Sequence, residues 1–263
     1  MMNIETSNTV LSPNTEFLNT AVNDAVLTVT LNRPQQLNAF VPEMLEEIAR
    51  LVNAASTDPS VAVIVLEGAG RAFSAGVDLK VLQGIEPAAG KIGDIFDQPA
   101  RTAYEAIRSA SCPVIAKVHG ACFTGALEMA LHCDFILTTV DTKFGDTHAK
   151  FGLRPTWGMS QTLAQAVGVR RAKELSFTAR TFSGADALSY GIASEAVADK
   201  AALDQLVSDY ARRIAANSSQ AVAAIKDLYD LSQQRLGMQE ALDAELSREY
   251  PLIEDTNQRL SDF

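Results

Sequence analysis

Residues 118–134, VHGACFTGALEMALHCD, contain the transition that decides the fold. An apolar stretch at 113–118, typical of a buried strand, runs into this segment and ends in a turn of small residues. A short apolar helix then starts near Thr124 or Gly125 and leads to a second strand-like stretch, CDFILTTV at 133–140. Strands that alternate with helices in this way predict an α/β fold.

The same alternation extends in both directions along the chain. Strands are predicted at 26–31, after a polar leader, and at 61–68, with a helix between them at 41–54. Residues 80–98 lack periodicity and indicate a loop, which a short helix around 104–107 follows. Apolar residues at three- and four-residue spacing predict further helices at 160–167, 170–177, 184–190, 201–215, 218–236 and 238–248. We expect a core domain at 1–200 and a C-terminal helical region at 201–263.

The composition indicates a globular protein. The chain has 263 residues, of which 47% are hydrophobic, and this is enough to bury a large core without disulfide bonds or metal ions. Its net charge of −10 would repel nucleic acid and anionic membranes at long range. We therefore expect neither of them as a partner.

The cysteines and the N-terminal residues indicate a cytoplasmic location. Cys112, Cys122 and Cys133 are an odd set without CxxC spacing, and their apolar neighbours are typical of reduced, buried thiols. The N-terminal residues contain no basic segment followed by an apolar run, and the longest aliphatic stretch, Val61 to Leu66, is too short to span a membrane.

Several common cofactor and metal motifs are absent from the sequence. It contains no GxxxxGK[ST] phosphate loop, and Phe73 stands where a dinucleotide-binding motif starting at Gly68 needs its third glycine. The three histidines have no zinc-ligand spacing, so we expect His119 and His132 to be structural.

The helix within the deciding segment carries one acidic residue, Glu128, among apolar neighbours. Gly125 lies three residues earlier, so its amide at the positive end of the helix and the Glu128 carboxylate share one helix face. The pair is suited to stabilising an anion next to a base. The alternatives are that Glu128 caps the helix N-terminus or points to solvent.

A second informative segment, RAFSAGVDLK at 71–80, leaves a buried strand through Ser, Ala and Gly. Alone it is compatible with an ordinary turn. Taken with HGACFTGALEMALHCD and TKFGDTHAKFGLRPTWG, however, it resembles the enoyl-CoA hydratase/isomerase (crotonase) superfamily, and the resemblance extends from LNRPQQLNAF at 31–40 to the C-terminal helices.

This resemblance implies a spiral of ββα units followed by a C-terminal helical trimerisation region, which forms a homotrimer or a hexamer. It also implies an oxyanion hole made by the backbone amides of Ala75 and Gly125, which would hold the thioester oxygen while an enolate develops. Removing one such donor typically slows a reaction on the order of 100-fold to 1000-fold.

The resemblance assigns Glu128 as one of the two glutamates with which hydratases activate water. Where the family has Phe-Gly-x-x-Glu, this chain has Phe144-Gly-Asp-Thr-His148, so a histidine stands at the second acid/base position. Imidazole transfers protons near neutral pH, and His148 is therefore a candidate partner of Glu128. The alternative is that His148 only lines the acyl pocket. Asp146 is a weaker candidate, because its side chain could face elsewhere.

The resemblance also implies an acyl-CoA substrate and no metal or redox cofactor. CoA recognition would fall to the loop at Ala75, Gly76, Asp78, Leu79 and Lys80, together with Lys226 on a C-terminal helix close to the phosphates. Ordinary solvated lysines are the alternative for the two cations. Trp157 would form a wall of the acyl pocket, unless it is only a core residue.

These features together favour an enoyl-CoA hydratase in which His148 replaces the second glutamate. A Δ3,Δ2-enoyl-CoA isomerase that uses the single glutamate is the first alternative. A serine hydrolase is another, because the sequence around Ser74 partly resembles a nucleophile elbow. The last alternative is a protein that binds CoA esters without catalysis.

Overall fold

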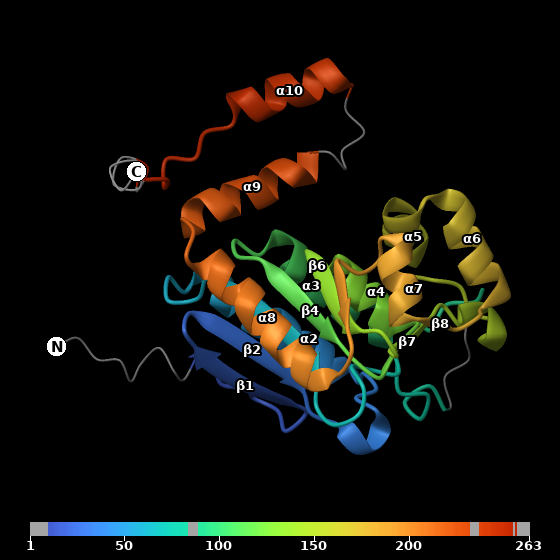
Figure 1. The fold of residues 1–263 in the computed structure, drawn as a ribbon. Helices are drawn as coiled ribbons and strands as arrows, with labels where there is room; N and C mark the ends of the chain where they lie inside the picture. The colour runs from blue at the N-terminus through green and yellow to red at the C-terminus, as the bar shows by residue number, and fades with distance from the viewer. Residues whose placement is uncertain (1–9, 84–88, 232–236, 255, 257–263) are drawn as a thin grey trace.

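The computed structural model describes residues 10–83, 89–231, 237–254 and 256. Its larger sheet has the order β1-β2-β3-β4-β6-β9 (Figure 1), and β1 is antiparallel to β2 while the other strands run parallel. These strands are β1 (Leu18–Asn23), β2 (Val26–Leu31), β3 (Val63–Gly68), β4 (Val114–Val118), β6 (Phe135–Thr139) and β9 (Glu195–Val197). The expected α/β fold is confirmed, as are the predicted strands that correspond to β2, β3, β4 and β6.

The strand β1 was not predicted, because it lies in the segment that the sequence shows only as a polar leader. This strand, LNTAVN, lies at the edge of the sheet, and only Leu18 is fully buried there. An edge strand with one buried residue lacks the alternation of apolar and polar positions by which strands are predicted. Its ladder to β2 is nevertheless continuous, from the pair Leu18 and Leu31 to the pair Asn23 and Val26.

Helices cover both faces of the larger sheet. The helices α2 (Pro42–Thr57) and α3 (Asp94–Ser109) pack on one face through the main hydrophobic core, which includes Ile64 and Leu66 of β3. On the other face, α8 (Lys200–Ala215) packs against Val63 and Val65 of the same strand. The strand β3 is therefore buried on both sides, which explains its uninterrupted apolar sequence.

The start of α3 corrects the prediction of a loop through residue 98. The helix begins at Asp94 and has Asp97 in its first turn, where acidic side chains interact favourably with the positive end of the helix dipole. Pro99 lies inside the helix and is buried, together with Phe96 and other residues of one face. Proline and aspartate suggested a loop, but aspartate is favourable in the first turn of a helix. Pro99 lies beyond that turn and removes one backbone hydrogen bond without ending the helix. Residues 84–88 of the predicted loop lie outside the described residues.

A smaller sheet of three strands carries the segment that decides the fold. It consists of β5 (Ala121–Phe123), β7 (Lys143–Gly145) and β8 (Phe182–Ser183), in that order. The strand β5 lies between β4 and α4 (Gly125–His132), where the sequence predicted only a turn of small residues, and the predicted helix start near Gly125 is confirmed. The remaining elements are η1 (Pro34–Gln36), η2 (His148–Phe151), α5 (Met159–Val167), α6 (Val169–Thr178), α7 (Gly184–Tyr190), α9 (Ser219–Leu231) and α10 (Met238–Ser247). The predicted C-terminal helices are confirmed, except that 232–236 lie outside the described residues.

A buried lysine attaches α8 to the sheet. The Nζ atom of Lys117 on β4 donates to Glu67 Oε2 on β3 at 2.6 Å and also forms an ion pair with Asp204 on α8. Thr30 donates a further hydrogen bond to Glu67. The helix α8 is thus part of the sheet packing. The division of the chain at residue 200 stays a prediction.

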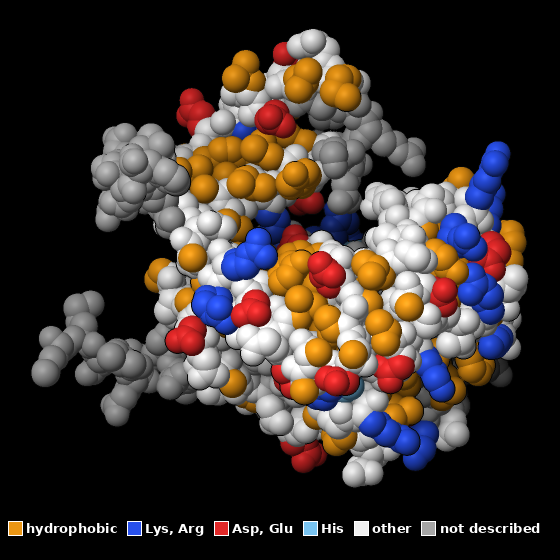
Figure 2. Space-filling view, viewed as in Figure 1, with side chains coloured by type: hydrophobic (Ala, Val, Ile, Leu, Met, Phe, Trp, Pro, Cys, Tyr) orange, Lys and Arg blue, Asp and Glu red, His pale blue; other side chains and the backbone are white. Residues whose placement is uncertain are grey.

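The helices α9 and α10 extend away from the body of the molecule (Figure 1). Apolar side chains gather over these two helices (Figure 2), and Leu246 on α10 is 86% exposed. A contiguous exposed apolar surface of this kind is typical of regions that are covered in an assembly. The homotrimer or hexamer stays a prediction. Among the described residues, no helix is both long and apolar enough to cross a membrane.

Candidate active site

Two backbone segments lie side by side at the centre of the site. Ser74 donates its amide to the Ala121 carbonyl at 3.0 Å, and Phe123 donates to the Ser74 carbonyl at 3.3 Å. Gly76 has a φ of +93°, and a β-carbon at this position would lie 2.8 Å from the Phe123 carbonyl oxygen and 3.5 Å from the Gly125 nitrogen. Only glycine allows this approach, which brings the loop of residues 72–78 against the start of α4.

A turn after η1 is hydrogen-bonded to the loop of residues 72–78 and to the residues before it. The buried side-chain amide of Asn38 donates to the carbonyls of Ala69 at 2.9 Å and Ala72 at 2.8 Å. The Asn38 carbonyl in turn accepts from the Ser74 hydroxyl at 2.8 Å. These contacts fix the direction of each amide in the loop.

The amide of Ala75 does not face the site, which corrects its assignment to the oxyanion hole. It donates to the Leu37 carbonyl at 3.0 Å and is therefore already hydrogen-bonded. Within the described parts of the chain, the amides of Val77 and Gly125 have no acceptor. No local sequence pattern distinguishes these amides, because the acceptor of the Ala75 amide belongs to a turn nearly forty residues earlier.

Glu128 lies inside the protein on the first turn of α4. Its side chain is 1% exposed, and Oε1 accepts hydrogen bonds from the amides of Trp157 and Met159, each at 3.1 Å. The carboxyl group therefore neither caps the helix nor reaches solvent. Burial raises the pKa of Glu128 to about 7, although His148 and the two amides act in the opposite direction. A carboxyl group with this pKa both accepts and donates protons near neutral pH.

The ring of His148 lies between the carboxyl groups of Glu128 and Asp146. His148 Nε2 lies 3.5 Å from Glu128 Oε2, and Nδ1 lies 2.7 Å from Asp146 Oδ1. All three side chains are buried. Burial alone would raise the pKa of Asp146, but hydrogen bonds from His148 and Ser176 hold it below its ordinary value. Asp146 thus faces the site rather than elsewhere.

Trp157 both borders the site and fixes Glu128. A β-carbon on Gly125 would lie 2.7 Å from the indole ring, so the ring packs directly on the start of α4. The indole Nε1 donates to Asp97 Oδ1 on α3 at 3.0 Å, and the Thr156 hydroxyl donates to the same oxygen at 2.7 Å. Sequence reasoning missed Asp97 and the backbone role of Trp157, because neither has a local motif.

The predicted CoA loop is organised by Asp78. Its carboxylate pairs with Arg33 at 2.9 Å and accepts from the Lys80 amide at 3.0 Å. Burial alone would raise the pKa of Asp78, but these partners hold it below its ordinary value. Leu79 and Lys80 are exposed next to it, whereas Gly76 is buried. The roles of these residues in CoA binding stay predictions.

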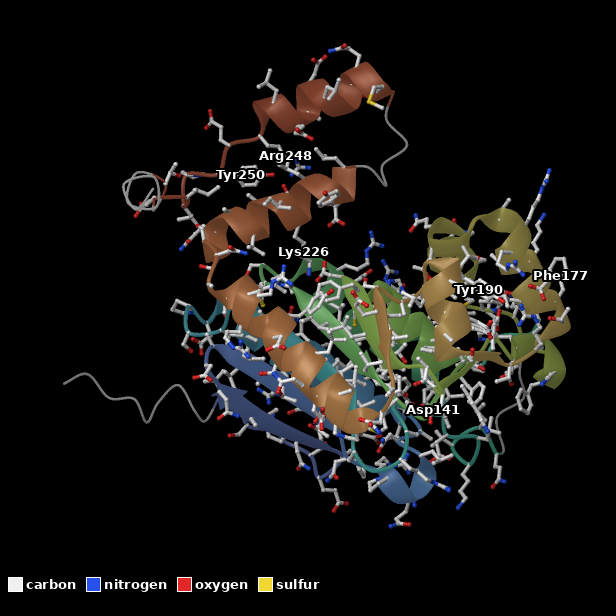
Figure 3. All side chains as sticks on the ribbon, in the orientation of Figure 1. Asp141, Phe177, Tyr190, Lys226, Arg248 and Tyr250 are labelled. Atoms are coloured by element: carbon white, nitrogen blue, oxygen red, sulfur yellow. The ribbon has the colours of Figure 1, made fainter. Side chains whose placement is uncertain are left out.

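Lys226 does not have the free ammonium group that the phosphate assignment requires. Figure 3 shows it on the side of α9 that faces the body of the molecule. Its Nζ donates to the carbonyls of Ile107 at 3.1 Å and Cys112 at 3.2 Å and to Asp134 Oδ2 at 2.9 Å. An ammonium group has three donors, and all three are used. In this structure Lys226 attaches α9 to the core.

The serine of the hydrolase alternative is not activated. The Ser74 hydroxyl is buried, donates to the Asn38 carbonyl and accepts from the Gly76 amide, and no histidine is among its partners. A nucleophilic serine needs a base within hydrogen-bond reach. His119 and His132 are structural as predicted, since their Nε2 atoms contact the carbonyls of Gly70 and Trp157.

Comparisons with known proteins identify the family. The family model described as enoyl-CoA hydratase/isomerase matches residues 21–261. The chain belongs to this family. As a member of the enoyl-CoA hydratase/isomerase family, it is an enzyme with the crotonase fold.

Individual relatives carry both parts of the family name. A probable enoyl-CoA hydratase from Rhizobium meliloti is 35% identical over 204 residues, which cover 78% of this chain and 77% of the relative. A peroxisomal Delta(3,5)-Delta(2,4)-dienoyl-CoA isomerase from Arabidopsis thaliana is 30% identical over 237 residues, which cover 87% and 85%. The solved structure of an enoyl-CoA hydratase from Bacillus anthracis superimposes with a TM-score of 0.84 at 28% identity and covers 93% of both chains.

Proposed function

We propose that this member of the family is an enoyl-CoA hydratase that uses Glu128 and His148 as its acid/base pair. One observation carries the proposal. His148 Nε2 lies 3.5 Å from Glu128 Oε2, both groups are buried, and Glu128 is in the first turn of the helix α4 that Gly125 begins. Hydration across a double bond needs two neighbouring groups that exchange protons, and the histidine supplies the second one.

The reaction begins with the thioester oxygen in an oxyanion hole. We assign this hole to the amides of Val77 and Gly125, which lie on adjacent segments and have no other acceptor in the described part of the chain. As water adds to Cβ, the electrons of the double bond move towards the thioester oxygen and form an enolate. The two amides stabilise this negative charge, and the helix dipole of α4 contributes to the stabilisation.

Glu128 and His148 then transfer the two protons of the reaction. One of them, in its basic form, removes a proton from water while the oxygen bonds to Cβ. The other, in its acidic form, delivers a proton to Cα when the enolate collapses, so that one molecule of water has been added. A pKa of about 7 for Glu128 provides both protonation states at neutral pH. Proton transfer by positioned groups typically contributes about 10²-fold to 10⁴-fold in rate.

For the acyl-CoA substrate, we propose that the exposed end of the loop at Leu79 and Lys80 contacts the CoA moiety. Lys80 is an exposed cation on a chain whose net charge is −10, so the loop provides a local positive group for an anionic ligand. The indole of Trp157, packed on Gly125, is the proposed boundary of the acyl group.

Isomerisation is the second candidate. It is favoured by Glu128 itself, since a buried carboxyl group with a pKa of about 7 is able to take a proton from one carbon and return it to another. The relative named as a dienoyl-CoA isomerase is consistent with this chemistry. In that case His148 would not take part in proton transfer to the substrate.

The test compares wild-type enzyme with His148→Gln on a panel of enoyl-CoA esters, with the products analysed by mass spectrometry. We expect the wild type to yield products heavier by one water and the variant to lose hydration by about 100-fold or more. Isomerisation without hydration by both proteins would favour the isomerase. Tight binding of CoA esters without any turnover across the panel would contradict both candidates.

A further inference from the structure

We propose that Asp146 is a positioning residue that holds His148 in the tautomer with its proton on Nδ1, so that Nε2 faces Glu128. The contact was not predicted from the sequence, where Asp146 was only a weak catalytic candidate. Its catalytic consequence rests on the proposed function, but the tautomer itself does not. The argument begins with the geometry around the imidazole ring.

A single oxygen of Asp146 holds both the ring and the backbone of His148. Oδ1 lies 2.7 Å from Nδ1 of the ring and accepts the His148 amide at 3.3 Å. The Asp146 side chain is almost fully buried, and Ser176 on α6 donates a further hydrogen bond to the carboxylate. The carboxylate is therefore fixed from two elements, and the ring has little freedom to rotate.

The charge of Asp146 determines which ring nitrogen carries the proton. An ionised carboxylate only accepts hydrogen bonds, so a nitrogen 2.7 Å away has to be a donor. The other tautomer would place the Nδ1 lone pair against a carboxylate oxygen at that distance, which is repulsive. In neutral His148 the proton is thus on Nδ1, and Nε2 presents its lone pair.

The consequence for Glu128 is a proton with a defined location. Oε1 is occupied by two backbone donors, so Oε2 is the oxygen that is free to carry a proton, and it faces Nε2 at 3.5 Å. Nε2 accepts this proton only if its own proton is absent. Asp146 therefore makes the imidazole an acceptor towards Glu128 and allows one proton to move between the two catalytic groups.

The local backbone explains how two residues so close in sequence form this pair. Asp146 follows β7, and His148 begins η2, so they are separated by Thr147 alone. The backbone turns at Thr147, which has a φ of −103° and a ψ of 10°, and an aspartate side chain in such a turn accepts the backbone amide two residues later. The Thr147 hydroxyl contacts the hydroxyl of Thr124, which fixes the corner against the residue preceding α4.

The experiment is nitrogen-15 NMR of the full-length enzyme labelled at histidine, recorded between pH 6 and 9 without substrate. The chain has three histidines, and the His148 signals are assigned by their absence in His148→Gln. We expect the neutral form of His148 in the wild type to carry its proton on Nδ1. A proton on Nε2 in the wild type would overturn the proposal, whatever any variant does.

The variant Asp146→Ala removes the acceptor that Nδ1 has among the described residues, and Asp141→Ala is the matched control. Asp141 is exposed at the other end of the same segment (Figure 3). We expect Asp146→Ala to move the His148 proton towards Nε2 and to lower kcat on the order of 100-fold or more, with KM changed less than about threefold. We expect the control to change neither. Wild-type kcat or an unchanged tautomer in folded Asp146→Ala would contradict the proposal.

These outcomes separate the positioning role from the proposed function. If the wild type shows the Nδ1 proton but no enoyl-CoA ester is hydrated, the hydratase assignment fails and the positioning role stands. If hydration is observed while neutral His148 carries its proton on Nε2, the positioning role fails and the hydratase assignment stands.

Discussion

Replacement of Glu128 by glutamine is expected to stabilise the protein above neutral pH while it abolishes turnover. Glutamine has the shape of a protonated glutamate, so its side-chain oxygen still accepts the amides of Trp157 and Met159. Its NH₂ group donates to His148 Nε2, as a protonated carboxyl group would. The variant therefore retains every contact of the buried group and removes only its ionisation.

The magnitude follows from the raised pKa of Glu128. The folded value is about 7, against an ordinary value of 4.5. Between these values the folded state binds more protons than the unfolded state, so the stability of the wild type falls as the pH rises through this range. Each pKa unit corresponds to about 1.4 kcal/mol, and the full difference is about 3 kcal/mol. The loss is complete above pH 7 and absent below pH 4.5.

The assay is urea denaturation of wild type and Glu128→Gln at pH 5, 6, 7 and 8, at one protein concentration. The variant should be more stable than the wild type by only about 1 kcal/mol at pH 5 and by about 3 kcal/mol at pH 8. The matched control is Glu105→Gln. Glu105 is 55% exposed and pairs with Arg101 at the surface, so its effect should stay within about 0.5 kcal/mol at every pH.

Parallel stability curves for wild type and Glu128→Gln between pH 5 and 8 would refute this reasoning. They would mean that the carboxyl group titrates normally and that burial does not make it an acid/base group at neutral pH. A variant that is less stable at every pH would show instead that its contacts depend on the charge.

Two further predictions concern packing around the site and the sheet. Lys117→Met removes the cation that Glu67 and Asp204 share under α8 and leaves Glu67 with the Thr30 hydroxyl and Asp204 with the exposed Lys200, so it should lower the free energy of unfolding by roughly 2 to 3 kcal/mol in urea denaturation. Exposed Lys200→Met should change it by less than about 0.5 kcal/mol. Gly76→Ala places a β-carbon 2.8 Å from the Phe123 carbonyl and should displace the Val77 amide, so kcat on an enoyl-CoA ester should fall about 100-fold. Wild-type turnover in Gly76→Ala would contradict the position of the oxyanion hole.

The sequence predicted the long buried elements better than the edge strand of the sheet and the first turn of α3. The strand β3 and the helix α2 followed from long apolar patterns, because burial of a whole face repeats at a fixed interval along the chain. The edge strand β1 and the first turn of α3 were missed, since one has a single buried residue and the other begins with residues that are also common in loops.

Within the site, the resemblance to the family pointed to Glu128 and His148, which the structure places 3.5 Å apart. It did not identify Asp97, because this residue acts only through the indole of Trp157. The resemblance also placed Lys226 near the CoA phosphates, but the ammonium group of this lysine attaches α9 to the core.

What the sequence by itself determined was the order of the main elements, the small residues that let two backbone segments meet, and the candidates for the acid/base groups. These are properties of local pattern and residue type. What only the tertiary structure decided was which amides are free and which carboxylates face one another. The Leu37 carbonyl accepts from the Ala75 amide, whereas the Val77 amide has no acceptor among the described residues. The Asp146 carboxylate contacts Nδ1 of the His148 ring. Hydrogen bonds satisfy whichever groups the fold brings within about 3 Å, and that proximity is set by packing across the whole chain.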